Sequence, residues 1–136
     1  MSDLVIFDDG CGAFGPLTEM RPAFALRTGG VTTLERIERT LGRFAGRFHV
    51  PDALVGVWSS RVSMAVNDLN GTQTVTCVNG RWRALQSLPS LEVGQACLGS
   101  GGVIAARMER AQAEAFLATG ELPDGMDTAE VDATLL

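Results

Sequence analysis

Two acidic residues and two glycines follow the first apolar run of the chain, and they are its clearest candidate for a binding site. Residues 4–7 read Leu-Val-Ile-Phe, and Asp8, Asp9, Gly10 and Gly12 come directly after them. Glycines let backbone N–H groups approach an anion, and carboxylates at a strand end can hold a metal ion or a ribose hydroxyl. The alternative is a polar turn closed by its aspartates. The pattern leaves both interpretations open.

Arginine supplies every basic side chain, because the eleven basic residues include no lysine. Chemistry that needs a Schiff-base lysine from this chain is therefore excluded. Arg21 and Arg27 follow the glycines, and a guanidinium can bind phosphate bidentately while it stays charged. The alternative for both residues is a solvated surface charge.

Cysteine and histidine give no strong signal. Cys11, Cys77 and Cys97 are widely spaced and form no Cys-x-x-Cys pair, so they indicate neither a disulfide framework nor a zinc site. We interpret them as free thiols in or near the core. His49 is the one histidine, and we interpret it as structural.

Strands and helices alternate in the predicted secondary structure. Strands are predicted over residues 4–7, 72–78, 95–98 and 103–107, and helices over residues 32–41, 52–66 and 108–119. Leu34, Ile37 and Leu41 recur at helical spacing after a threonine cap. Residues 99–102 read Gly-Ser-Gly-Gly and are interpreted as a turn rather than a phosphate cradle. Such alternation predicts an α/β fold with a mainly parallel sheet and flanking helices, and ligands beyond the carboxyl ends of the strands.

Length and charge exclude several classes of protein. The chain has 136 residues and a net charge of −5, which fits one globular domain and argues against nucleic acid as a partner. No apolar run reaches the length of a membrane span and no signal peptide is evident, so we expect a cytoplasmic protein with no membrane partner. We assign residues 1–120 to the α/β domain and residues 121–136 to an acidic tail or the start of a further segment.

Five short motifs occur in a fixed order near the amino terminus. They are Phe7-Asp8-Asp9, Pro16-Leu17-Thr18, Arg21-Pro22, Leu26-Arg27-Thr28-Gly29 and Thr32-Thr33-Leu34-Glu35. The run resembles the opening of sugar nucleotidyltransferases. It is most similar to the alternative bacterial bifunctional N-acetylglucosamine-1-phosphate uridylyltransferases and glucosamine-1-phosphate acetyltransferases.

Two other families that carry acids after a first strand do not fit. Haloacid-dehalogenase-type phosphatases need a second aspartate two positions after the first, where this chain has Gly10 or Cys11. Response-regulator receivers require a lysine, which the chain lacks.

The resemblance implies a Rossmann-like, nucleotide-diphospho-sugar transferase type of fold, shortened here. It implies transfer of a nucleotidyl group from a nucleoside triphosphate to a sugar phosphate with release of pyrophosphate, in the synthesis of bacterial cell-wall precursors. The nucleotide-binding residues that it implies are Asp8, Asp9, Gly10, Gly12, Thr18, Asn79 and Arg81. Arg21 and Arg27 would be catalytic, and Asp8 and Asp9 would bind Mg²⁺. The resemblance is compatible with a homo-oligomer and with a C-terminal β-helix acyltransferase in a longer protein.

The chain departs from the standard family at three places. Phe14 and Ala23 stand about where the family carries a loop arginine and a lysine, and Arg81 replaces the metal-binding aspartate of an Asn-Gly-Asp motif. An arginine cannot ligate a cation. Two hypotheses follow: an active enzyme in which Arg21, Arg27 and an aspartate take over these roles, or a catalytically inactive binding or assembly module.

Overall fold

Residues 3–9, 22–25, 27–28 and 31–135 are described by a computed structural model. The strands are β1 Leu4–Phe7, β2 Arg27–Thr28, β3 Val31–Thr32, β4 Arg47–His49, β5 Ala65–Val66, β6 Thr74–Asn79, β7 Gln95–Ser100, β8 Gly102–Glu109 and β9 Asp127–Thr134. The α-helices are α1 Thr33–Leu41, α2 Val55–Ser59 and α3 Arg110–Thr119, and the 3₁₀ helices are η2 Ala23–Ala25 and η3 Asp52–Leu54.

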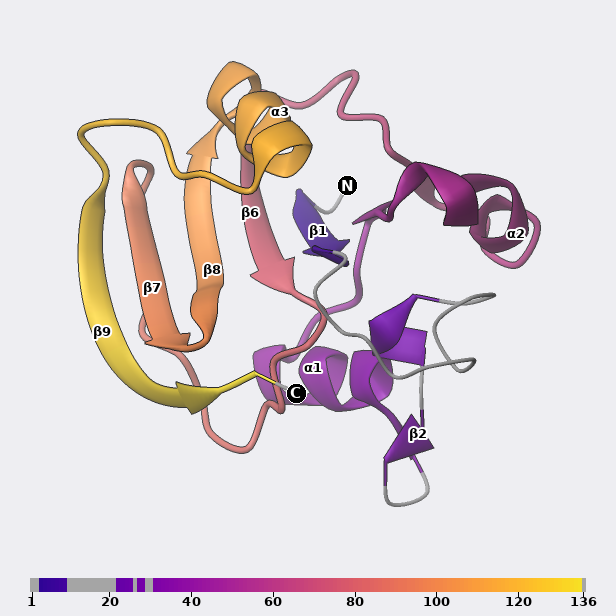
Figure 1. Ribbon diagram of the computed structural model, residues 1–136, viewed down its shortest axis with the longest axis horizontal. Helices are drawn as coiled ribbons and strands as arrows, with labels where there is room; N and C mark the ends of the chain where they lie inside the picture. Colours follow the sequence, from indigo (N-terminus) through magenta and orange to yellow (C-terminus); the bar gives the residue numbers. More distant parts are fainter. Residues whose placement is uncertain (1–2, 10–21, 26, 29–30, 136) are drawn as a thin grey trace.

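A seven-stranded mixed sheet organises these elements, in the order β5-β4-β1-β6-β8-β7-β9 (Figure 1). β1 runs parallel to β4 and β6, β4 to β5, and β7 to β9, whereas β8 is antiparallel to β6 and β7. The α/β class is confirmed, and the mainly parallel sheet is confirmed only in part. The reason is the tight turn at Gly101 and Gly102 (φ 100° and 145°) between β7 and β8, because so short a connection can join only antiparallel strands.

The side chains of β1 divide between two hydrophobic clusters, one on each face of the sheet. Leu4 and Ile6 belong to a cluster with side chains of α1, α2 and η2, whereas Val5 and Phe7 belong to a cluster with side chains of α3. Successive side chains of a strand point to opposite faces of its sheet. Helices therefore cover both faces of the sheet, which buries all four residues of β1.

The ends of α1 follow the sequence signals closely. Thr32 and Glu35 form a capping box, in which the Glu35 backbone N–H donates to Thr32 Oγ1 at 3.1 Å and Glu35 Oε1 accepts from the Thr32 backbone N–H at 3.1 Å. Gly42 closes the helix in the left-handed conformation (φ 71°), and its N–H donates to the Glu38 carbonyl at 2.9 Å. The predicted helix is confirmed because its caps are local interactions.

Other elements differ from expectation. Residues 121–136, which we predicted as an acidic tail or the start of a further segment, contain β9, which forms an edge of the sheet (Figure 1). Val131 and Ala133 alternate there with Glu130 and Asp132, which is the period of a strand with one covered face. The predicted helix over residues 52–66 is wrong in extent, since the short η3 and α2 form in its first part and the strand β5 forms at its end.

The cysteines that the structure describes lie in the core, as expected. Cys77 and Cys97 are buried free thiols, while Cys11 lies outside the described residues. Burial raises the pKa of the Cys77 thiol to about 12, which makes it a poor nucleophile. Trp58 and Trp82 are also buried.

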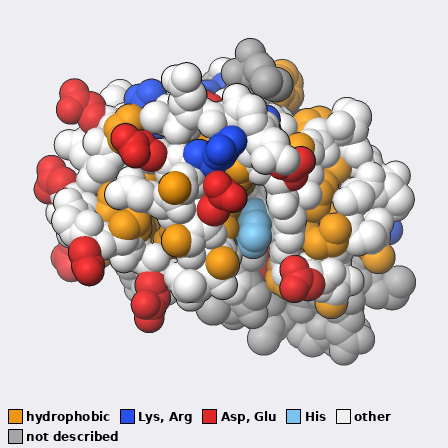
Figure 2. All heavy atoms as spheres, turned by 90° about the horizontal axis from the view of Figure 1, so that it is seen from above, with side chains coloured by type: hydrophobic (Ala, Val, Ile, Leu, Met, Phe, Trp, Pro, Cys, Tyr) orange, Lys and Arg blue, Asp and Glu red, His pale blue; other side chains and the backbone are white. Residues whose placement is uncertain are grey.

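The outer surface carries the excess of acidic groups. Figure 2 shows acidic side chains spread across one face of the molecule, in keeping with the net charge of −5. In the part of the chain that the structure covers, no helix combines the length and the apolar character needed to cross a membrane.

Gly80, directly after β6, gives a test of the packing. A Cβ atom there would lie 2.5 Å from Cδ2 of Phe24 and 3.0 Å from the Phe7 carbonyl oxygen. We expect Gly80→Ala to lower the free energy of unfolding by about 1–3 kcal/mol, because the added methyl group overpacks the core. Urea denaturation measures the change.

Gly56→Ala is the matched control, because a Cβ atom at this exposed position of α2 meets nothing within 4 Å. Alanine also has the higher helix propensity. Equal losses of stability in the two variants would contradict the proposed close packing at Gly80.

Candidate functional site

Two distant segments meet at the carboxyl ends of β1 and β6. The strands are parallel, with Phe7 opposite Asn79, so the residues that follow them emerge at one edge of the sheet. Asp9 follows β1, and Arg81 follows β6. The pairing of strands thus brings together residues 72 positions apart in sequence.

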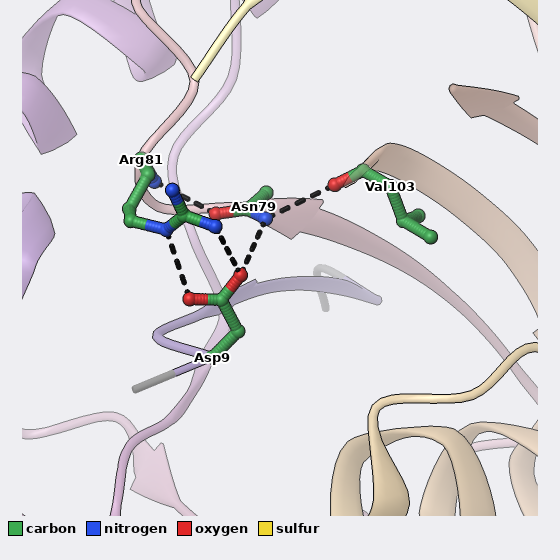
Figure 3. Close-up of polar contacts among 4 residues, drawn as sticks. All are labelled: Asp9, Asn79, Arg81 and Val103. Carbon is green, nitrogen blue, oxygen red and sulfur yellow. Dashed lines mark hydrogen bonds and ion pairs between the residues drawn. The ribbon is translucent and has the colours of Figure 1, made fainter. Parts of the chain in front are cut away.

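Asp9, Asn79 and Arg81 form one hydrogen-bonded group, which we call the polar triad (Figure 3). Arg81 Nε donates to Asp9 Oδ1 at 2.9 Å, and Arg81 Nη2 donates to Asp9 Oδ2 at 2.7 Å. Asn79 Nδ2 donates to Asp9 Oδ2 at 3.1 Å and to the Val103 carbonyl at 3.0 Å. Asn79 Oδ1 accepts from the Arg81 backbone N–H at 2.9 Å. Each member therefore fixes the position of the other two.

The polar triad is shielded from water. Side-chain exposure is 10% for Arg81 and 21% for Asp9, and Asn79 is 1% exposed. Limited exposure strengthens a bidentate, charge-assisted pair, which is already among the stronger hydrogen-bonded contacts in proteins. The Arg81–Asp9 pair is therefore a fixed part of the folded protein and differs from a solvated surface ion pair.

A pocket of about 590 Å³ adjoins the polar triad. Its other walls come from the β7–β8 turn at Gly101 and Gly102, the start of β8 and the carboxyl end of α3. Phe7 and Phe116 supply an apolar wall, with ring centroids 5.3 Å apart and the rings edge to face. A pocket of this size, with apolar and polar groups in its walls, suits a small molecule. A second pocket, of about 430 Å³, lies against the amino end of β1 and is lined by none of the predicted site residues that the structure describes.

Asp8 lies in a different environment from Asp9. It is buried, and its backbone N–H donates to the His49 carbonyl at 2.8 Å. Burial lowers the pKa of His49, and the negative charges of Asp52 and Asp8 oppose that shift in part. The two adjacent carboxylates therefore interact with different groups: Asp8 with the His49 imidazole and Asp9 with the Arg81 guanidinium.

The structure describes only some of the residues that the sequence singled out. It brings Asp9, Asn79 and Arg81 into contact. Asp8 directly precedes Asp9 in the chain. Arg27 lies on β2, but its side chain is outside the described part of the structure. Four further predicted site residues lie outside the described residues altogether: Gly10, Gly12, Thr18 and Arg21. The roles predicted for these residues, and for Arg27, stay predictions.

Two features of the site were missed by sequence reasoning. The Val103 carbonyl anchors Asn79, and a backbone carbonyl has no signature in the sequence. The carboxyl end of α3 forms a pocket wall. The sequence predicted this helix but not its place beside the site. Gly101 and Gly102, in the predicted turn, also line the pocket, which their interpretation as a turn did not indicate.

As arranged, the polar triad does not fit a divalent cation. Mg²⁺ needs oxygen ligands with available lone pairs at close range, whereas both Asp9 oxygens accept N–H donors. A Mg²⁺ ion about 4 Å from the guanidinium would be repelled by about 2 kcal/mol in water and about 8 kcal/mol at an effective dielectric constant of 20. Within the described ranges, no three His, Cys, Asp or Glu side chains gather to hold a metal. Binding of Mg²⁺ by Asp8 or Asp9 stays a prediction, and Asp9 would first have to release Arg81.

The pKa of His49 generates a prediction about pH. It lies below the ordinary value of 6.5, so between these two values the unfolded chain binds more protons than the folded chain. We therefore expect the free energy of unfolding to fall as the pH decreases from about 7.5 to about 5.5. The decrease should be smaller in His49→Gln, and larger in Asp8→Asn, which removes a charge that favours the imidazolium.

Urea denaturation at each pH measures the effect, and an NMR titration of the imidazole measures the pKa directly. A pKa of His49 at or above its ordinary value in the folded protein would contradict this account.

Comparison with known proteins identifies the family of the chain. No curated protein matches the chain. A family model described as sugar nucleotidyl transferase matches residues 4–136, a range that contains every strand from β1 to β9 and all members of the polar triad. The match extends over nearly the whole chain, and the chain therefore belongs to the sugar nucleotidyl transferase family.

Proposed function

We propose that this chain binds a nucleoside triphosphate and a sugar 1-phosphate where β1 and β6 end, and that its reaction is nucleotidyl transfer. The observation that carries the proposal is the polar triad beside a pocket of about 590 Å³, in a chain that belongs to this family. In open α/β sheets, ligands bind beyond the carboxyl ends of the strands. The triad and the pocket lie at that edge.

The reaction requires no nucleophile from the protein. An oxygen of the sugar phosphate forms a bond to the α-phosphorus of the triphosphate. The bond from that phosphorus to the oxygen bridging to the β-phosphate breaks, and its electron pair leaves with pyrophosphate. Such a step depends on positioning and on fixed positive charge. Arg21 and Arg27 are the proposed catalytic residues, and Asp8, Gly10, Gly12 and Thr18 are proposed to line the nucleotide site with the triad.

A second candidate is a binding or assembly module without catalysis. The observation that favours it is that Arg81 and Asn79 already occupy both oxygens of Asp9. Under this proposal the fold holds ligands, or joins a larger assembly, without transferring a nucleotidyl group. The two candidates share a binding site and differ in turnover.

The finer resemblance at residues 7–35 supports a more specific proposal. It connects the chain to bacterial bifunctional enzymes that make cell-wall precursors in the cytoplasm. A homo-oligomer and a following β-helix acyltransferase belong to the same proposal, and the Mg²⁺ requirement that the resemblance implies would have to be met by groups other than Asp9 while Arg81 holds that carboxylate. Sequencing the gene downstream of residue 136 tests the acyltransferase.

Ligand binding should raise the melting temperature. UTP or dTTP with Mg²⁺, at about 100 times its Kd, adds about 2.7 kcal/mol to the free energy of unfolding and moves the transition by several degrees. We expect Arg21→Ala to reduce the shift. Arg110→Ala is the matched control, because Arg110 is exposed at the end of α3 opposite the pocket, and it should leave the shift unchanged. No shift with any nucleoside triphosphate at millimolar concentration would contradict the proposal.

Turnover separates the two candidates. With UTP, N-acetylglucosamine 1-phosphate and Mg²⁺, we expect nucleotidyl transfer to release pyrophosphate, whereas the binding or assembly module would release none. A coupled phosphate assay measures release. Release that disappears in Asp8→Asn or Asp9→Asn, with both variants still folded by circular dichroism, would support the active enzyme, and no release by the wild-type chain would favour the binding or assembly module.

A further inference from the structure

We propose that Asp9 is a positioning residue for Arg81 rather than a metal ligand, and that this edge of the site binds the phosphate groups of its ligand without a divalent cation. The identity of the ligand rests on the proposed function. The role of Asp9 concerns the ligand-free protein and can be tested by itself.

The first argument is the number of donors that converge on Asp9. Among the residues that the structure describes, Nε and Nη2 of Arg81 donate to its two oxygens at 2.9 Å and 2.7 Å, and Nδ2 of Asn79 donates at 3.1 Å. A cation bound to Asp9 would have to displace donors that carry positive or partial positive charge. The carboxylate is therefore already neutralised by the protein.

The second argument is that the partners of Asp9 are themselves fixed. The Asn79 amide group donates to Asp9 and to the Val103 carbonyl and accepts from the Arg81 N–H (Figure 3). The backbone on either side of Arg81 is also held, since Gly80 N–H donates to the Phe7 carbonyl at 2.7 Å and Trp82 N–H donates to the Asn79 carbonyl at 3.0 Å. An arginine held in this way cannot leave Asp9 without disturbing its neighbours.

The third argument is the composition of the pocket. Asp9 is the one acidic side chain, and Arg81 the one basic side chain, among the described residues that line it. A site for Mg²⁺ normally offers one or two carboxylates that are open to the metal, together with substrate phosphates. A guanidinium instead carries a permanent charge and five N–H donors, of which Asp9 receives one from Nε and one from Nη2. The donor set thus favours direct binding of phosphate by Arg81.

The first experiment uses Mn²⁺ alone with the ligand-free protein, followed by water-proton relaxation. We expect no saturable binding to the wild-type chain at up to about 1 mM Mn²⁺. Arg81→Asp removes the guanidinium and adds two oxygens, and should create a site that is lost again in the double variant Arg81→Asp with Asp9→Asn. Arg81→Gln provides a second test that does not place two carboxylates together. Saturable Mn²⁺ binding to the wild type that disappears in Asp9→Asn would overturn the proposal.

The positioning role has its own spectroscopic readout. The Arg81 Nε–H donates to Asp9, so its ¹⁵N–¹H NMR signal should be shifted and protected from exchange in the wild type. Asp9→Asn should lose that protection while the backbone amide signals of β1 and β6 remain. Retention of the protected signal in Asp9→Asn would show that another group holds Arg81.

The second experiment compares UTP binding in EDTA and in about 5 mM Mg²⁺ by calorimetry. We expect the two Kd values to agree within about threefold, and Arg81→Gln to weaken binding at least tenfold in EDTA. Arg81→Lys should weaken UTP binding less than Arg81→Gln does, because a lysine keeps the positive charge but not the planar array of N–H donors. Arg83→Gln is the matched control, since it removes the same charge from an exposed arginine two positions away that does not line this pocket.

The outcomes separate this inference from the proposed function. UTP binding that needs Mg²⁺ by more than tenfold would overturn the metal-free site and leave the proposed function standing. Failure of UTP, and of every other nucleoside triphosphate, to bind in either buffer would contradict the proposed function and the phosphate half of the inference, while the Mn²⁺ experiment would still decide the role of Asp9.

Discussion

The parallel pairing of β1 with β6 is the constraint on which the candidate site depends. Its register places Phe7 opposite Asn79, so that Asp9 and Arg81 leave the sheet side by side. A shift of one residue would turn every side chain of β1 to the other face, and both hydrophobic clusters would lose their members from that strand. The burial of β1 on both faces therefore selects the register, and the register assembles the polar triad.

The close packing around Gly80 joins the core to the site. Phe24 lies against Gly80 and also stacks on Phe48 and meets Trp58 edge to face. This aromatic group packs against the turn at Gly80. The Asn79 side chain fixes the same turn by accepting a hydrogen bond from the Arg81 backbone N–H. Isolated surface ion pairs contribute little to stability, but here the pair is tied to the core. Its main effect is to give Arg81 one orientation, which a binding site requires.

Much of the local structure follows from the sequence, because local interactions decide it. The helix over residues 33–41 has its caps, Thr32, Glu35 and Gly42, within one turn of its ends. The apolar run at residues 4–7 is long enough only for a strand buried on both faces. β9 was not recognised, because its alternating acidic residues resemble a solvated tail until β7 is present to pair with it. The alternation of strands and helices carries no direction and did not predict the antiparallel β8, although the short turn at residues 99–102 permits only that direction.

The candidate site, too, was predicted in part from the sequence and decided in part by the tertiary structure. The sequence by itself determined the family, through ordered motifs that the match over residues 4–136 bears out at the level of sugar nucleotidyl transferases. It also singled out Asp9, Asn79 and Arg81 as separate candidates. Only the tertiary structure decided that these three contact one another, that both oxygens of Asp9 face N–H donors, and that Asp8 lies beside His49 instead. The physical reason is that pairing of strands sets which distant side chains meet, and pairing depends on burial over the whole sheet rather than on the residues of the site.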